Sequence, residues 1–209
     1  MDSIFRDFTY EAYKNIFECI KYRGLKAESP QVDAATLIEI FRKNYECEVI
    51  ATGRETTIFL LFAAKRDTKV GDLFKQIKSA ITKHERRGMQ RYSLVVDIDI
   101  SKKPIILNLL NKITEEYAES ISNQKTYYEI ISYDQMTFNW PASDHHTPHS
   151  IVGPEDEDIK YLEATRLNKY KIRINDTGNI WCGGKPGDMI KIVGKNSLIT
   201  YRIVINALV

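Results

Sequence analysis

The run Thr57-Ile-Phe-Leu-Leu-Phe-Ala-Ala64 constrains the fold more than any other stretch of the sequence. Apolar residues follow one another here, so a strand would carry apolar side chains on both of its faces. Such a strand is covered on both sides, as in the parallel sheets of α/β proteins. The run is far shorter than the ~20 residues of a membrane-spanning helix, and no membrane partner is expected. It predicts a buried central strand in a layered α/β fold.

Helical and strand patterns alternate around this run. Apolar residues at helical spacing predict helices near 9–23, closed by Gly24, from Asp33 to about 45, from Gly71 to Gly88, and from 105 to about 117. Strands are expected at a hairpin that starts near Val49, at 57–64, at 92–98 and at 127–133. The order strand, helix, strand, helix, strand favours some parallel pairing.

The composition changes after residue 134. Residues 139–154 hold three prolines and three histidines, which predicts a linker or an extended segment. A short helix is expected at 155–168, and strands are expected at 170–174, 189–193 and 198–205, with turn chemistry at 183–188. The expected architecture is therefore an α/β (α+β) fold with two domains, an α/β domain at 1–138 and a small, mostly β domain at 139–209.

Charge and cysteine content narrow the functional classes. The net charge of the 209 residues is only +2, which does not by itself imply a nucleic-acid partner. Locally, residues 65–91 hold nine Lys and Arg against three Asp and Glu. This excess of positive charge is typical of a solvent-exposed face, and it also suits a surface that lies near a polyanion. Three distant cysteines fit buried thiols in a reducing compartment, and the N-terminus lacks the order of a signal peptide.

Two motifs that could hold a metal or a phosphate fall short of the required pattern. His145, His146 and His149 lie close together, but Cys182 is the one cysteine in this half and no paired cysteines accompany them. Lys185 follows two glycines, but Pro186 comes next where a phosphate-binding loop needs Ser or Thr and then a helix. The sequence therefore predicts no metal, no cofactor and no small-molecule ligand.

A nuclease-like pattern is also incomplete. Asp97 and Asp99 alternate at the end of one expected strand, and Lys65 ends the strand before it. Metal-dependent nucleases use such carboxylates and such a lysine. Ala63 stands where the remaining acidic ligand would be expected. No catalytic residue is predicted, although a free-standing, metal-dependent nuclease-like factor that processes nucleic acid stays open as the alternative function.

The C-terminal segment resembles a known family. Gly184-Lys-Pro-Gly-Asp-Met-Ile-Lys-Ile-Val193, followed by Thr200-Tyr-Arg-Ile-Val204, is similar to the assembly domain of the H-type subunit of archaeal RNA polymerases, a domain that the fifth common subunit of eukaryotic nuclear RNA polymerases shares. Upstream, the histidines and acidic helix start at 146–157 fall in the family's order. Lys21-Tyr-Arg-Gly-Leu25 looks like the turn that ends the first helix of the eukaryotic protein. The resemblance covers nearly the whole chain.

Departures from the family pattern point to a divergent lineage. Asp176-Thr177 lacks the family's proline, and the loop at Ser101-Lys102-Lys103-Pro104 has a displaced proline and two added lysines. A large DNA virus with its own transcription machinery is one such lineage. The resemblance then implies the cytoplasm and the virion for a cytoplasmic virus, and the nucleus for a host polymerase.

The resemblance implies a non-catalytic polymerase subunit. The C-terminal domain would dock on the largest subunit among other polymerase subunits, and the N-terminal, nuclease-like jaw domain would contact downstream double-stranded DNA without sequence preference. The candidate DNA contacts are Lys102, Lys103, Lys83, Arg86 and Arg87. The candidate partner contacts are His149, Lys185, Tyr201 and Arg202, next to a structural turn of Gly184, Pro186, Gly187 and Asp188.

Overall fold

The computed structural model divides into two compact units, residues 1–138 and 139–209, which are described separately. It describes residues 3–44, 46–62, 70–84, 91–96, 105, 126–144, 146–153, 155–156, 160 and 170–205. Among these residues, no helix is both long enough and apolar enough to cross a membrane.

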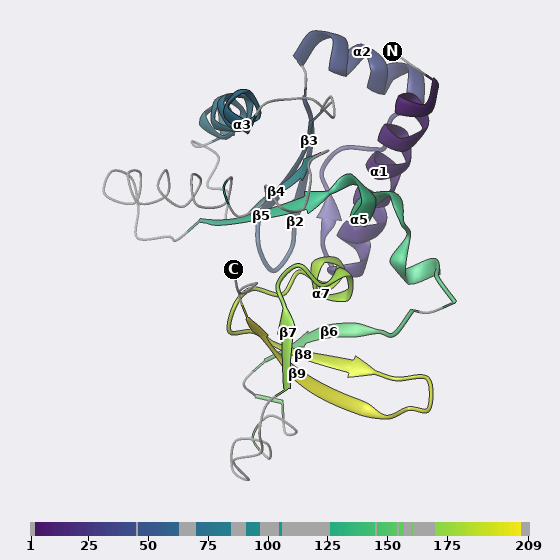
Figure 1. Cartoon of the computed structure of the whole chain (residues 1–209), viewed down its shortest axis with the longest axis vertical. Coiled ribbons are helices and arrows are strands. Elements are labelled where there is room, and N and C mark those ends of the chain that lie inside the picture. The colour runs from purple at the N-terminus through teal and green to yellow at the C-terminus, as the bar shows by residue number, and fades with distance from the viewer. Residues whose placement is uncertain are drawn as a thin grey trace. The chain divides into compact units, whose positions relative to one another are not determined.

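The N-terminal unit is built on a five-stranded sheet whose strands follow the chain order (Figure 1). The strands are β1 (Lys26–Ala27), β2 (Glu46–Thr52), β3 (Thr57–Phe62), β4 (Arg91–Val96) and β5 (Tyr127–Ser132). The first three pair antiparallel, and β3, β4 and β5 pair parallel. Every residue of β3 and β4 is buried, which confirms the prediction from the apolar run at 57–64.

Helices cover both faces of this sheet. They are α1 (Ser3–Tyr22), α2 (Ala34–Asn44), α3 (Val70–His84) and α5 (Tyr133–Thr137). Figure 1 shows α3 on one side of the sheet, with α1 and α5 on the other. Successive side chains of a strand point to opposite faces, so each central strand supplies a separate set of residues to each layer.

The face toward α3 is entirely apolar in its interior. Leu73, Ile77 and Ile81 of α3 pack on even-numbered residues of the strands, such as Leu60 and Leu94. All five are at most 4% exposed, and the full burial of a Leu or Ile side chain contributes about 1.5–3 kcal/mol. This layer therefore fixes α3 on the sheet and leaves the opposite side of that helix facing water.

The end of α1 is set by a glycine, as the sequence predicts. Gly24 has φ of +68°, and the N–H groups of Gly24 and Leu25 donate to the carbonyls of Lys21 and Ile20 at 2.9 Å each. This pair of bonds is the Schellman arrangement that closes many helices. It reverses the chain just after Arg23, and the Arg23 side chain enters the space between α1 and the sheet.

The C-terminal unit is a four-stranded sheet in the order β6-β8-β9-β7, with a short helix on one face (Figure 1). Its elements are η3 (Trp140–Ala142), β6 (His149–Val152), β7 (Tyr170–Arg173), α7 (Thr177–Cys182), β8 (Met189–Val193) and β9 (Ile199–Ile205). The pairs β6–β8 and β8–β9 are antiparallel, whereas β7 and β9 run parallel.

Close backbone packing holds α7 against this sheet. A Cβ atom at Gly178 would lie 2.5 Å from Nε2 of His149, and one at Gly184 would lie 2.2 Å from Oδ1 of Asn179. Only glycine fits at such separations. The Asn179 amide donates to the carbonyls of Ile174 and Gly184 at 3.0 and 3.3 Å, which ties the two ends of this segment together.

The predicted mixed α/β class is confirmed, with differences in single elements. The first helix begins six residues before the predicted start near 9, and the predicted linker at 139–154 contains η3 and β6. No pattern in the sequence predicts β1, α5 or α7. Each of these is six residues or shorter, so its formation depends on tertiary contacts more than on a periodic pattern. The predicted helices at 105–117 and 155–168 lie largely outside the described residues.

Candidate nucleic-acid and partner surfaces

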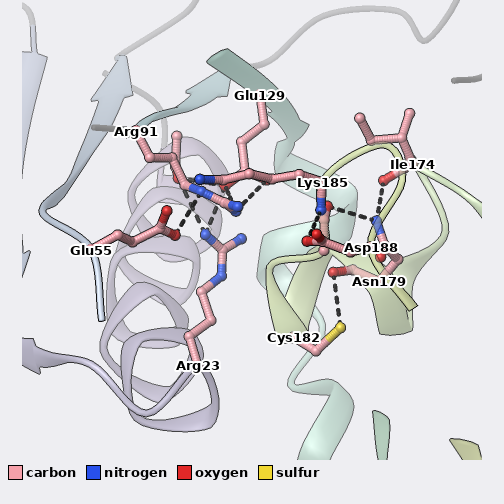
Figure 2. A network of polar contacts seen from close by, with 11 residues as sticks. Arg23, Glu55, Arg91, Glu129, Ile174, Asn179, Cys182, Lys185 and Asp188 are labelled. Carbon is pink, nitrogen blue, oxygen red and sulfur yellow. Dashed lines mark hydrogen bonds and ion pairs between the residues drawn. The ribbon is translucent and has the colours of Figure 1, made fainter. Parts of the chain in front are cut away.

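Two arginines and two glutamates form a buried ionic cluster on the α1 side of the N-terminal sheet (Figure 2). Nη1 of Arg23 donates to Oε1 of Glu129 at 2.7 Å, and Nη1 of Arg91 lies 3.4 Å from the same oxygen. The hydroxyl of Ser93 also donates to this oxygen, at 2.5 Å. Nε of Arg91 lies 2.9 Å from Oε1 of Glu55. Both arginine side chains are fully buried and both glutamate side chains are 9% exposed, so the charges balance without much help from water.

The arginines keep Glu129 ionised in this interior position. Burial by itself would raise the pKa of the carboxyl, but the charges of Arg23 and Arg91 and the hydrogen bonds from Arg23 and Ser93 outweigh it and lower the pKa to about 2. A carboxylate held in this way is a poor general base near neutral pH, because its proton affinity is too low. The cluster therefore fits a role in fixing the end of α1 to the sheet.

Sequence reasoning missed this cluster. Arg91 and Glu129 stand at positions that alternate with buried apolar residues of β4 and β5, and Arg23 precedes the helix-ending Gly24. A charged residue at an inward strand position signals a buried ion pair. The signal does not name the partner, because the four residues come from four separate stretches of the chain.

The exposed side of α3 forms a basic surface, as its sequence predicts. A shallow, open depression there is lined by Lys75, Lys78, Ser79, Thr82 and Lys83. Lys83 pairs with Glu46 of β2, and Lys75 lies 3.9 Å from Asp72. Among the described residues, no acidic group pairs with Lys78. The surface keeps an excess of positive charge, of the kind that suits phosphate groups.

The other candidate DNA contacts cannot be placed. Arg86, Arg87, Lys102 and Lys103 lie outside the described residues. Of the five predicted contacts, the structure therefore places Lys83 alone, at the end of the basic surface of α3 and in contact with Glu46.

The turn after α7 is closed by its own backbone and by one carboxylate. Oδ2 of Asp188 accepts from the backbone N–H of Lys185 at 2.7 Å, and the N–H of Asp188 donates back to the carbonyl of Lys185 at 2.9 Å (Figure 2). Gly187 has φ of +94°, a region that favours glycine, and its N–H donates to Val204 of β9. These bonds place Lys185 and Pro186 at the surface end of β8 and β9.

The structure separates the predicted partner contacts Tyr201 and Arg202. They are neighbours on β9, so their side chains point to opposite faces of the sheet. Tyr201 stands opposite Lys191 of β8, whose ammonium lies 5.7 Å from the centre of the tyrosine ring. Arg202 is exposed and stands opposite Ile190 on the face that carries α7. The two residues therefore belong to different surfaces.

His149 lies in the interior of the C-terminal unit. It is 9% exposed, and its ring packs against Gly178 and lies 6.3 Å from the ring of Trp140. Its Nδ1 lies 2.5 Å from the carbonyl of Thr147. These contacts all fall within the unit, and the role of His149 as a partner contact stays a prediction.

Neither predicted pattern of metal chemistry gains a site from the described residues. Among them, no group of three His, Cys, Asp or Glu side chains could hold a metal ion. The nuclease-like residues Lys65, Asp97 and Asp99 lie outside the described ranges, as does His145. Cys19, Cys47 and Cys182 are all buried and none is in a disulfide, which confirms the prediction of buried thiols.

Comparison with known proteins finds two curated proteins that are similar to this chain. No protein-family model matches the sequence. Two curated proteins of African swine fever virus, from a Kenyan pig isolate and a South African tick isolate, are each 24% identical over 208 residues. The match covers 95% of this chain and 93% of each viral protein, and both are named DNA-directed RNA polymerase RPB5 homolog. The chain is thus similar over nearly its whole length to RNA polymerase subunits of a large DNA virus, which confirms the family resemblance that its motifs indicate.

Proposed function

We propose that this chain is a non-catalytic subunit of a multisubunit, DNA-dependent RNA polymerase. The observation that carries the proposal is the similarity to two RPB5 homologs along 95% of the chain. A match of that extent includes both units, so the relationship does not rest on one shared motif. The Glu129 carboxylate of the buried cluster is held by arginines, which suits a scaffold better than an active site.

The C-terminal unit is proposed to dock on the largest polymerase subunit. The segment from Gly184 to Val204 carries the motif shared with the assembly domain of the family, and its turn holds the half-buried Lys185 just before β8. Lys185, Tyr201 and Arg202 remain the proposed contacts, with Tyr201 and Arg202 serving different faces.

The N-terminal unit is proposed to contact downstream double-stranded DNA. The basic surface of α3 supplies the support, because lysines bind phosphate without reading bases, so the contact would be independent of sequence and sensitive to salt. Lys83, Arg86, Arg87, Lys102 and Lys103 remain the proposed contacts. Because the named relatives are viral, a virus-encoded polymerase is the favoured source, with the cytoplasm and the virion as the proposed compartment.

Affinity purification of the tagged full chain from its native cells tests the subunit assignment. We expect both large polymerase subunits to be recovered in amounts near that of the chain. Recovery of the chain alone, from gently lysed cells at low salt, would count against the assignment. The nuclease-like alternative predicts instead divalent-dependent cleavage that is lost in both Asp97→Ala and Lys65→Ala.

Salt-dependent binding of the full chain to a DNA duplex tests the surface of α3. The double substitution Lys75→Gln/Lys78→Gln should weaken binding and reduce the slope of log affinity against log salt by about 2, roughly 1 for each lysine that no longer binds a phosphate. The matched control is Arg42→Gln/Lys43→Gln, which removes the same charge from exposed positions of α2. Equal slopes for the two variants would remove α3 from the DNA-binding surface.

A further inference from the structure

The four strands of the C-terminal unit have two faces of different character. The register places on one face, here called the outer face, a set of side chains that alternate along β7, β8 and β9: Lys171, Arg173, Met189, Lys191, Val193, Ile199, Tyr201, Ile203 and Ile205. The inner face carries the buried residues Ile172, Ile190 and Val204, and on the outer face Met189 alone is buried.

The helical elements of this unit lie on the inner face. Gly184, after α7, would place a Cβ within 3.1 Å of Ile190 and Val204, and Gly178 within α7 meets the ring of His149. Trp140 of η3 also contacts His149. His149 and Ile190 belong to the inner face, so in the described part of this unit both α7 and η3 leave the outer face uncovered.

The outer face is more apolar than the solvent-exposed face of an ordinary one-sided sheet. Along β9 its residues are Ile199, Tyr201, Ile203 and Ile205, an unbroken alternation of apolar and aromatic side chains. Ile199 is 44% exposed and Leu198 beside it is 68% exposed, whereas Tyr201, Ile203 and Ile205 are half-buried. One-sided antiparallel sheets normally carry polar side chains on the solvent face. A continuous apolar stripe of this kind is typical of a surface that a second layer covers.

Positive charge borders the apolar stripe on both sides. Lys171 and Arg173 of β7 stand opposite Ile203 and Ile205, and Lys191 of β8 stands opposite Tyr201. Both β7 residues are exposed. The four strands hold four lysines and arginines and no aspartate or glutamate, so the strands by themselves carry a net positive charge.

We infer that the outer face binds an acidic, amphipathic segment of another polymerase subunit, whose apolar side chains cover the stripe on β9 and whose carboxylates pair with Arg173, Lys171 and Lys191. Complementary charge around an apolar centre is the usual composition of a specific protein interface. The inference rests on the proposed function, since it takes the partner to be a polymerase subunit. It adds which face of the sheet is used and the charge of the segment that it receives.

Two charge reversals test the inference in the full chain. Arg173→Glu reverses an exposed cation of the outer face, and Arg42→Glu makes the same charge change at an exposed position of α2, a helix that carries none of the proposed contacts. Affinity purification should show the recovery of the large subunits falling about tenfold or more with Arg173→Glu and changing less than about twofold with Arg42→Glu. Thermal unfolding of both purified variants checks that each remains folded.

The outcomes separate this inference from the proposed function. If the unaltered chain recovers no polymerase subunit, the proposed function fails. If the unaltered chain and Arg173→Glu recover equal amounts, or if Arg42→Glu reduces recovery as much as Arg173→Glu does, the function stands and the outer face is overturned. Loss of duplex DNA binding or of self-association in Arg173→Glu, with subunit recovery unchanged, would also overturn it in favour of nucleic acid or a second copy.

A photo-crosslinking residue identifies the charge of the partner segment and covers the case in which Arg173→Glu fails to fold. A benzophenone amino acid at Ile199 faces the stripe, whereas one at Arg42 lies on α2, outside this unit. We expect a crosslink from position 199 to a subunit segment with net negative charge, and no such crosslink from position 42. A crosslink from 199 to a basic segment would refute the proposed chemistry.

Discussion

Replacing Glu129 by glutamine removes one negative charge from a buried cluster that holds two arginines and two glutamates. Nearly the same shape remains, and the amide oxygen can still accept from Ser93. Glu55, which pairs with Arg91, would then be the carboxylate that remains in the cluster, although both arginine side chains are fully buried. Breaking a buried ion pair from one side commonly costs about 3–5 kcal/mol, because the remaining charge is left without its partner.

The pKa of Glu129 gives an independent magnitude. A carboxyl whose pKa falls from 4.5 to about 2 on folding stabilises the native state by roughly 3 kcal/mol at neutral pH. The two routes agree, so we expect Glu129→Gln to lose about 3 kcal/mol. For a unit of 138 residues this corresponds to a fall in Tm of roughly 10 °C.

Urea and thermal unfolding of the two variants Glu129→Gln and Glu48→Gln measure this loss. Glu48 is an exposed glutamate on β2, and its substitution should change the free energy of unfolding by no more than about 0.5 kcal/mol. In a double-mutant cycle with Arg23→Met, the two losses should not add, because both substitutions remove the same hydrogen bond at 2.7 Å. If Glu129→Gln unfolds like Glu48→Gln, the ionic cluster does not stabilise the unit and the reasoning is refuted.

The pH dependence of the same loss provides a second check. The folded pKa of Glu129 lies below its unfolded value, so its stabilisation is present above about pH 4.5 and is lost as the pH falls toward 2. The difference in unfolding free energy between the unaltered chain and Glu129→Gln should therefore shrink across this window. A difference that stays constant from pH 6 to pH 3 would contradict the proposed ionisation of Glu129.

Two further predictions concern the C-terminal unit. Gly184→Ala should destabilise it by about 2 kcal/mol or more, because the new Cβ would lie 2.2 Å from Oδ1 of Asn179. The control Gly153→Ala should change stability little, because no atom lies within 4 Å of its new Cβ. Equal Tm values for the two variants would refute the packing argument. Asp176→Ala should lower the free energy of unfolding by about 1 kcal/mol, because this carboxylate caps α7 by accepting from the N–H of Gly178 at 3.0 Å. Chemical denaturation should show that Asp176→Asn retains most of the stability, because Asn also caps helices well.

Much of the N-terminal unit could be predicted from its sequence. The apolar run at 57–64 predicts a strand buried on both faces, and Gly24 and Asp33 mark a helix end and a helix start that the structure confirms. These signals are local, since each depends on residues a few positions apart. The segment 149–152 carries no such signal, because its four residues become a strand only by pairing with β8.

The residues of the candidate sites show the same division. The basic character of α3 follows from helical spacing, which places its lysines away from the apolar side that packs on the sheet. By contrast, the sequence placed Tyr201 and Arg202 together as partner contacts, and only the strand register shows that they face opposite sides. His149 was predicted as a partner contact from its motif, yet its position between Gly178 and Trp140 became visible only once those distant residues were assembled.

The class of the fold, the order of its main helices and strands, and the family resemblance all follow from local patterns, because hydrophobic period, caps and motifs are read along the chain. The tertiary structure decided which charges are buried together and which faces remain uncovered. Arg23, Glu55, Arg91 and Glu129 lie up to 106 positions apart, and no local rule pairs them. Their association depends on how α1 settles on the sheet, because the low polarity there makes an unpaired charge costly and each arginine must find a carboxylate.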